Sequence, residues 1–284
     1  MTSTNLALGE SRPIERALKG PLDAWVEGAI AAAPNNRELQ RQLDAIDSAD
    51  VLLRFLHRFV LFNDALAARV PFLAGLIHLT PNVFLDSEPG PSFCRQANGR
   101  IAAYVAEAAN DEYRMTNGRN LVHQRLSQVF FRAALDHFHV DGATFGHVHP
   151  VPPALDELLS EARGKYFDVR RPEHIFAGLG FHVGLEFFAH EEFNMVDAYL
   201  RARYPELVTS LERVGSDGSP YHWLALHTVV EIEHYRAGLE ALNAAVKYYH
   251  PQAEAPRMVA LIKEGFAEFI DLQRRYYQAI HCDA

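Results

Sequence analysis

Apolar residues recur every three to four positions along most of the chain, which is the pattern of amphipathic helices. No alternating strand pattern and no internal repeat stands out, so an all-α fold is expected. Prolines, glycines and short polar runs separate the periodic segments. Helices are predicted over residues 21–33, 37–46, 51–70, 72–79, 92–112, 120–138, 154–164, 172–203, 205–213, 221–246 and 257–280.

The segments between these helices carry further expectations. Ser48 or Asp50 can cap the third helix, and Pro71 is expected to kink or end it. Residues 81–91 are predicted to be an exposed loop, and 140–153 a long irregular link. Neither side of that link has enough helices for its own core, so 20–284 is predicted to be one domain after a tail at 1–19.

The predicted helix over 221–246 carries the strongest chemical signal. His227, Glu231 and His234 sit at i, i+4 and i+7, so they fall within a wedge of roughly 60° on one side. Leu224 and Val230 border that wedge, which indicates that it faces inward. Two imidazoles and a carboxylate are costly to bury unless a charged partner satisfies them. A divalent metal is the simplest partner, and the alternative is a buried hydrogen-bonded network.

Two other segments place metal-ligand residue types on inward positions. Glu112 ends one predicted helix, and His123 lies early in the next, on the side of Leu126 and Phe130. Glu186 shares an otherwise apolar stripe with Leu179 and Val183 in the 172–203 helix. Each of these carboxylates also has a simpler interpretation. In that interpretation, Glu112 is a helix end in contact with solvent. Glu186 is then a charge partner of His182 or His190, at i−4 and i+4.

Composition narrows the functional classes. The chain has 284 residues, 49% of them hydrophobic, which is enough for a large core. A net charge of −9 with no basic stripe argues against nucleic-acid binding. No run of 18 apolar residues and no signal peptide is found, and Cys94 and Cys282 form no metal or disulfide pattern. A cytoplasmic protein is therefore expected, and a homodimer is compatible with the sequence.

The inward positions together give three carboxylates and three imidazoles, which match a di-iron or di-manganese site inside a helical bundle. A ferritin-like site needs two Glu-x-x-His pairs, and this chain has one, Glu231 to His234. Fifteen histidines add a weak hint of metal chemistry, although the HFHVDGATFGHVH stretch fits no compact tetrahedral site. The six candidate ligands are Glu112, His123, Glu186, His227, Glu231 and His234.

Three motifs in this order resemble the haem-oxygenase-like di-iron oxygenases and oxidases: DEYRMTNGRNLVHQRL, GLGFHVGLE and H-x3-E-x2-H. The similarity covers roughly residues 101–246. It implies a bundle of about seven core helices preceded by N-terminal helices. It also implies two Fe(II) ions held by the six candidate ligands, with O2 as co-substrate and catalytic roles for the three carboxylates, Glu112, Glu186 and Glu231.

The chain departs from the family pattern at two places. Glu231 stands where the family commonly has Asp, and the interval from Glu112 to His123 is one residue longer than usual, which leaves Asp111 as an alternative ligand. Some members add a carboxylate from an earlier helix, for which Glu107 and Asp64 are the candidates.

The resemblance implies an O2-dependent oxidoreductase that acts on a small molecule in a biosynthetic reaction. The favoured substrate is a small amino acid or amine, which would undergo N-oxygenation, desaturation or C–C cleavage. Three alternatives remain at this point. They are oxidative decarboxylation of a fatty acid at the same site, a cofactor-free oxidase or hydrolase of the same fold, and a non-enzymatic metal- or haem-binding protein.

Overall fold

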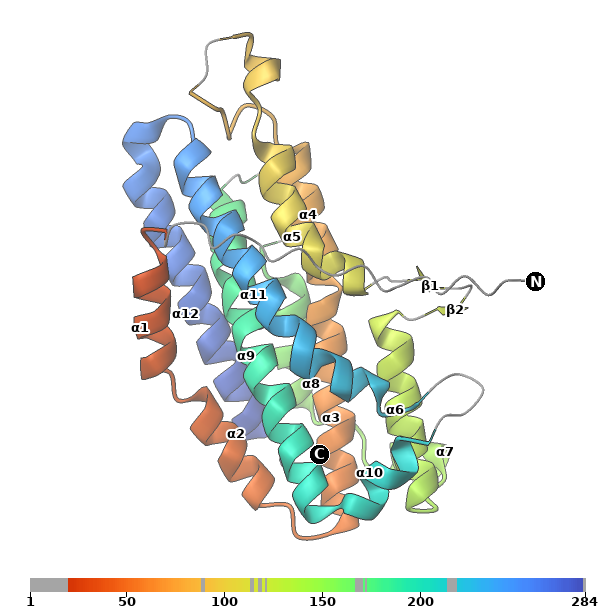
Figure 1. The fold of residues 1–284 in the computed structure, drawn as a ribbon. Coiled ribbons are helices and arrows are strands. Elements are labelled where there is room, and N and C mark those ends of the chain that lie inside the picture. Colours follow the sequence, from red (N-terminus) through yellow and green to blue (C-terminus); the bar gives the residue numbers. More distant parts are fainter. Residues whose placement is uncertain are drawn as a thin grey trace, which may run out of the picture.

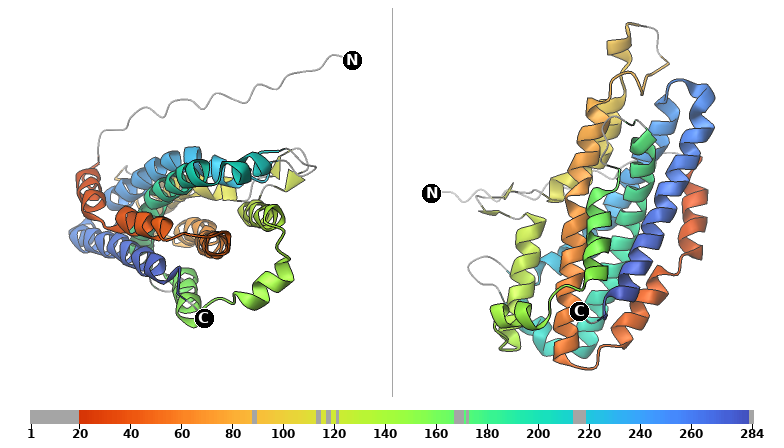
Figure 2. Two further views of the ribbon diagram at one scale, coloured as in Figure 1. Left: turned by 90° about the horizontal axis from the view of Figure 1, so that it is seen from below. Right: turned by 180° about the vertical axis from the view of Figure 1, so that it is seen from behind.

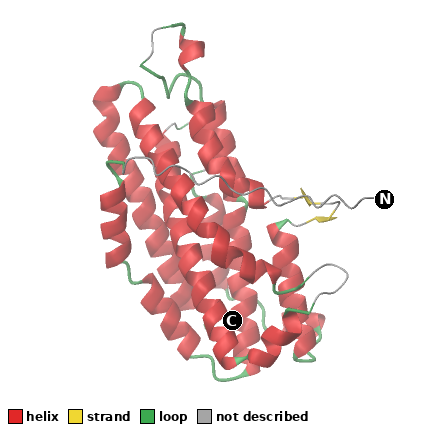
Figure 3. Ribbon diagram, in the orientation of Figure 1, coloured by secondary structure: helices red, strands yellow, loops and turns green. Residues whose placement is uncertain are grey.

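The computed structural model describes residues 20–87, 90–112, 115–116, 119–120, 122–166, 171, 173–213 and 219–282. The tail predicted at 1–19 lies outside the described residues. Helices make up most of the described chain (Figure 1, Figure 3), and its two strands have two residues each. The predicted all-α fold class is therefore confirmed, as a bundle of helices.

The described helices match most of the predicted segments to within a few residues. In chain order they are α1 (Asp23–Ala32), α2 (Asn35–Asp44), α3 (Ala49–Ala67), α4 (Arg69–Leu79), the 3₁₀ turn η1 (Ser92–Arg95), α5 (Asn98–Glu112), α6 (His123–His137), α7 (Gly142–Val148), α8 (Pro153–Gly164), α9 (Glu173–Arg203), α10 (Pro205–Leu211), α11 (His222–Tyr248), the 3₁₀ turn η2 (Gln252–Glu254) and α12 (Ala255–Ala279).

The long helix α9 packs most extensively against α12 and α11, which run beside it in Figures 1 and 2. The contact with α12 is close because glycines stand where the two backbones meet. A Cβ on Gly180 would lie 1.9 Å from the Ile262 carbonyl oxygen, and one on Gly265 would lie 1.9 Å from that of Ala177. Only glycine allows this approach. The surrounding buried side chains form one hydrophobic cluster that extends from Leu22 to Ile280.

The boundaries of α3 and α4 follow from local chemistry. Of the two predicted caps, Ser48 is the one at the N-cap position, and its hydroxyl accepts a 3.3 Å hydrogen bond from the Val51 amide. The break between the helices falls at Ala68, not at Pro71 as predicted. Pro71 lies in the first turn of α4, where a helix needs no amide hydrogen from it.

The prediction of an irregular link over 140–153 was wrong. The link contains α7, whose N-cap residue Asp141 accepts hydrogen bonds of 2.8 Å from both the amide and the hydroxyl of Thr144. The helix has only seven residues and two glycines, too few positions for a visible periodic stripe. A second small departure is the antiparallel pair β1 (Met115–Thr116) and β2 (Arg119–Asn120), at the break predicted between α5 and α6.

The span Ala49–Leu79 is long and apolar enough to cross a membrane by composition alone, with a mean hydropathy of 1.5 in its most apolar window. Of that window, 61% is buried inside the bundle. Phe55, Phe59 and Phe62, which follow one another at helical spacing, have no exposed surface. Packing in the protein core therefore accounts for the hydrophobicity of this span.

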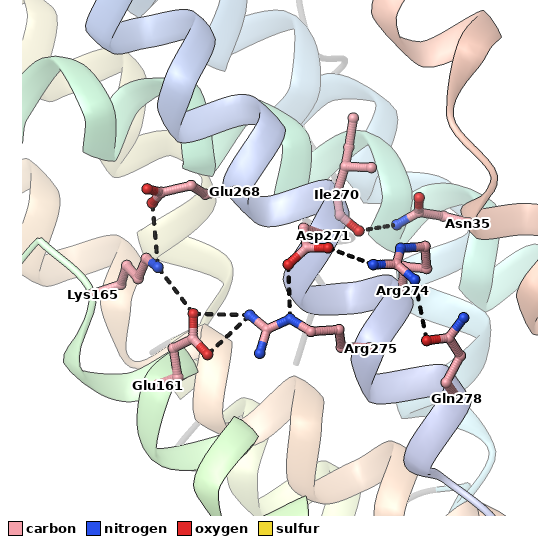
Figure 4. A network of polar contacts seen from close by, with 9 residues as sticks. All are labelled: Asn35, Glu161, Lys165, Glu268, Ile270, Asp271, Arg274, Arg275 and Gln278. Carbon is pink, nitrogen blue, oxygen red and sulfur yellow. Dashed lines mark hydrogen bonds and ion pairs between the residues drawn. The ribbon is translucent and has the colours of Figure 1, made fainter.

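A network of charged side chains fastens the end of α8 to α12 (Figure 4). Glu161 on α8 accepts two hydrogen bonds of 3.0 Å from Arg275 and one of 2.9 Å from Lys165. Lys165 also lies 3.4 Å from Glu268 on α12, whose carboxylate accepts a hydrogen bond from the Tyr166 hydroxyl. These contacts hold Tyr166, which has a left-handed φ of 63°, against the helices of the core.

Candidate metal centre

The polar stripe predicted on α11 faces the interior of the bundle. His227, Glu231 and His234 are 6%, 3% and 4% exposed, whereas Val229 on the opposite side of the helix is 66% exposed. Trp223, one turn before His227, is fully buried and anchors the same face. The helical spacing of the three polar residues therefore brings their side chains together in a place that water does not reach.

Glu231 lies between the two imidazoles of its own helix. Its Oε1 is 3.6 Å from Nε2 of His227, and its Oε2 is 3.2 Å from Nδ1 of His234. The two oxygens of one carboxylate therefore face two different nitrogen donors. A carboxylate in this position can ligate two cations at once.

Glu186 reaches the same place from α9. Its Oε2 lies 3.5 Å from Nδ1 of His234, and the donor atoms of Glu186, Glu231 and His234 all lie within 4.8 Å of one another. The other oxygen of Glu186, Oε1, is 3.0 Å from Nδ1 of the buried His182, but it makes no hydrogen bond in the described part of the chain. Two carboxylates and one imidazole from two helices thus form one compact donor group.

His123, the first residue of α6, approaches from the other side. Its Nδ1 lies 3.2 Å from Nε2 of His227, and its Nε2 accepts a 3.2 Å hydrogen bond from the Trp223 indole N–H. Nδ1 of His227 is 2.6 Å from the Trp223 carbonyl oxygen. Because a carbonyl can only accept, this nitrogen carries the hydrogen, and Nε2 keeps its lone pair for the site. Histidine ligands of metals are commonly oriented by such a bond.

Asp64 on α3 completes this second group. Its Oδ1 lies 3.6 Å from Nε2 of His123 and accepts a 2.8 Å hydrogen bond from the Ser127 hydroxyl. Glu107, the other carboxylate considered from an earlier helix, is exposed on α5. Of the two candidates, Asp64 is therefore the one that contacts a candidate ligand, whereas Glu107 faces solvent.

The two buried carboxylates differ in how readily they ionise. Burial raises the pKa of Glu231 well above its ordinary value, and the neighbouring charge of Glu186 raises it further. Burial acts in the same direction on Glu186, but His182 and His234 outweigh it and hold the pKa of that carboxyl below its usual range. Burial, reinforced by His123, lowers the pKa of His227 well below its ordinary value. Its surroundings thus favour the neutral form of the His227 imidazole, which is the form that binds metals.

Some of the predicted site residues are not found in this donor cluster, and the side chains of others lie outside the described residues. Glu112 ends α5, and its side chain lies outside the described residues, as does its alternative Asp111. The His190 ring is half-buried and lies 3.4 Å from the Asn194 side-chain amide, and no contact between it and Glu186 is found in the described part of the chain. The simpler reading of Glu186 as a partner of His182 does correspond to a real contact, and it coexists with the contact to His234.

Trp223, Ser127 and Asp64 orient the candidate ligands, and none of them was singled out as orienting from the sequence. Trp223 could have been found, because it lies four residues before His227 and one turn of helix brings its carbonyl under that ring. Asp64 on α3 and Ser127 on α6 are 63 positions apart in the chain, and no local sequence pattern predicts that they meet.

Comparison with known proteins adds no relative. No protein-family model matches the chain, no curated protein matches it, and no solved structure matches it. The interpretation of the site therefore depends on its own chemistry.

Proposed function

We propose that this chain is a non-haem di-iron enzyme of the haem-oxygenase-like class, which uses O2 to oxidise a small amino acid or amine. The observation that carries the proposal is the placement of Glu231, with one oxygen toward His227 and the other toward His234, in a buried site. A carboxylate between two nitrogen donors can bridge a pair of metal ions, each held by one of the imidazoles.

The donor set fits divalent iron. Carboxylate oxygens and imidazole nitrogens are suitable ligands for Fe(II), and no thiolate that would favour a softer ion contacts the described cluster. The charge of Glu186 disfavours the ionisation of Glu231, and Oε1 of Glu186 is buried without a hydrogen bond in the described residues. A bound cation would relieve both costs.

On this proposal, the candidate ligands divide between two metal positions. The first position would use Glu186, Glu231 and His234, and the second would use Glu231, His123 and His227, with Asp64 beside His123. The resemblance adds Glu112 to this set. When bound, two Fe(II) ions supply electrons and Lewis acidity for reactions of O2.

The protein groups around the ligands prepare the site for this chemistry. Trp223 fixes the ring of His227 through its carbonyl and the ring of His123 through its indole. Phe193 stacks on His227, with ring centroids 4.5 Å apart, and has no exposed surface. These aromatic side chains would keep water away from a metal ion held by the candidate ligands.

The test is an anaerobic titration of the metal-free protein with Fe(II), followed by exposure to O2. We expect up to two ions per chain and a transient visible absorption that appears only after O2 is added. Glu231→Ala is expected to lose both iron binding and O2 consumption, whereas Glu233→Ala serves as the control because Glu233 is exposed on the same helix. A Glu231→Ala protein that retains wild-type iron content and O2 consumption would refute the proposal.

One specific observation favours a second candidate, a centre with a single metal ion. Among the described residues, the one group with donor atoms close enough to share an ion is Glu186, Glu231 and His234. His123 and His227 lie within hydrogen-bond distance of each other instead. Iron analysis separates the candidates: a titration that saturates at one ion per chain, with no loss of affinity in His123→Ala, would favour the single-metal centre.

A further inference from the structure

A cavity lies between the first turns of α3 and the segment that contains the end of α6 and α7. Its volume is about 300 Å³. A cavity of about 150 Å³ holds one benzene molecule, so this one has room for a molecule of about two fused rings. Most of its wall is apolar and comes from Ala49, Leu53, Phe138, Val140, Phe145 and Val148.

Aromatic packing fixes one wall of this cavity. Phe145 on α7 is 4% exposed, and its ring centroid lies 5.5 Å from that of Phe131 on α6 and 5.5 Å from that of His57 on α3. The start of α7 is fixed as well, because Asp141 caps it through the amide of Thr144. These contacts hold α7 against α3 and α6, so the wall needs little ordering when a ligand binds.

The polar residues that line the cavity have partners within the protein. Oδ1 of Asp50 lies 2.8 Å from Nε2 of His149, and Oδ2 of Asp50 lies 3.4 Å from Nε of Arg54. The Thr144 hydroxyl donates a 2.8 Å hydrogen bond to Asp141. A ligand is therefore not required to satisfy them. A charged group placed against the apolar wall would lose its water without gaining a partner, which is costly.

The cavity is separate from the candidate metal centre. Leu53 in its wall and Asp64 beside His123 both lie on α3, and about three turns of helix, or about 16 Å, separate them. Phe138 follows the last residue of α6, whereas His123 is the first residue of that helix. A molecule in the cavity is therefore too far from the candidate ligands to react there.

We propose that this cavity is a binding site for an uncharged, apolar molecule of up to about two fused rings. The inference goes beyond the proposed function, because the molecule bound here is not the one that is oxidised. Asp50, Thr144 and Val148 are exposed, so the cavity opens to solvent and a ligand can enter without separation of the helices.

The test is equilibrium dialysis of the full-length protein with two probes. Indole is an uncharged two-ring molecule, and indole-3-carboxylate carries a negative charge on the same rings. We expect saturable binding of about one indole per chain and at least about tenfold weaker binding of indole-3-carboxylate, because its charge must leave water. Equal affinity for the two probes, or no saturable binding of indole, would overturn the inference.

Two variants of the wall place the bound probe. Val148→Asp introduces a charge at a residue that is 59% exposed, so the fold should tolerate it. Ala49→Leu takes up space in the cavity and introduces no charge. Each is expected to weaken indole binding about tenfold or more. Val229→Asp is the matched control, because Val229 is 66% exposed on α11 and does not line the cavity. Wild-type affinity in both wall variants would count against the cavity as the site.

A second copy of the chain is the other occupant that an exposed apolar residue at the rim allows. Sedimentation velocity of the wild type and of Val148→Asp separates the two cases, and we expect the same oligomeric state in both. A wild-type dimer that Val148→Asp dissociates would show a contact between copies and refute the small-molecule site. Iron content should be equal in the two proteins, so the outcome for this cavity is independent of the outcome for the metal centre.

Discussion

Glu231→Gln is the most informative single change in this protein. The substitution keeps the length and shape of the side chain and removes the negative charge between His227 and His234. Both proposed metal positions share this carboxylate, so both should weaken together. The metal-free protein should respond in the opposite direction, because a buried charge is lost.

The expected loss of metal affinity can be bounded from below. Removal of a group that only orients a metal ligand costs about 10–100-fold in affinity, so removal of a direct, shared ligand should cost about 100-fold or more. A variant at Trp223, which orients His227 and His123 without being a ligand, should fall within the smaller range. The two magnitudes therefore separate a ligand from an orienting residue.

The expected gain in stability follows from the pKa of Glu231, which burial raises well above its ordinary value. The unfolded chain releases this proton at lower pH than the folded protein does, so wild-type stability falls as pH rises above the ordinary value. Glutamine has no proton to release. At neutral pH, Glu231→Gln should stabilise the metal-free protein by about 1–2 kcal/mol, or raise Tm by about 2–8 °C in a chain of this size.

The assay combines Fe(II) titration with thermal and chemical unfolding of the metal-free protein. Glu233→Gln is the matched control, because Glu233 is exposed on the same helix and pairs with Arg236. This control should change neither the Fe(II) affinity nor the stability of the metal-free protein. Glu231→Asp should keep the metal, if the residue common in the resembled family also serves here. Wild-type iron affinity in Glu231→Gln, or a large loss of metal-free stability, would refute the reasoning.

Fe(II) titration should show two unequal steps, because His123 and His227 lie 3.2 Å apart in mutual contact and must separate before a second ion binds; two equally tight sites would contradict this. Burial raises the pKa of Glu192 from 4.5 to about 7, so wild-type stability falls as pH rises through that range. In Glu192→Gln, about 3 kcal/mol of this pH-dependent loss should disappear from the free energy of unfolding, as measured by chemical denaturation. Burial lowers the pKa of His57 to about 4, so stability falls as pH drops from 6.5. His57→Phe should flatten this acid-side loss, and an unchanged pH profile of unfolding would refute either prediction.

Local spacing predicted the α11 part of the site well. The helix was expected over 221–246 and spans His222–Tyr248, and its three polar residues share one buried face. This succeeded because α11 has one buried side and one exposed side, so its sequence pattern records which way each residue points.

The same reasoning failed on α9, for a physical reason. Residues 175–186 of this helix are all buried, because other helices cover it on every side. A helix that is apolar all round has no pattern that distinguishes one face from another. Glu186 could therefore be identified as unusual, with His182 or His190 as its partner, but the sequence could not show that His182 is the one in contact with it.

The contacts among the candidate ligands differ between the two ends of the site, and this difference has a consequence for the proposed chemistry. At one end, the donor atoms of Glu186, Glu231 and His234 lie within 4.8 Å of one another. At the other end, His227 and His123 contact each other, and Trp223 bonds to both of them. The first proposed metal position therefore has its donor atoms close together, whereas the second requires the two imidazoles to part. The first ion is expected to bind without this rearrangement, and binding of the second is expected to depend on how firmly Trp223 holds the two rings.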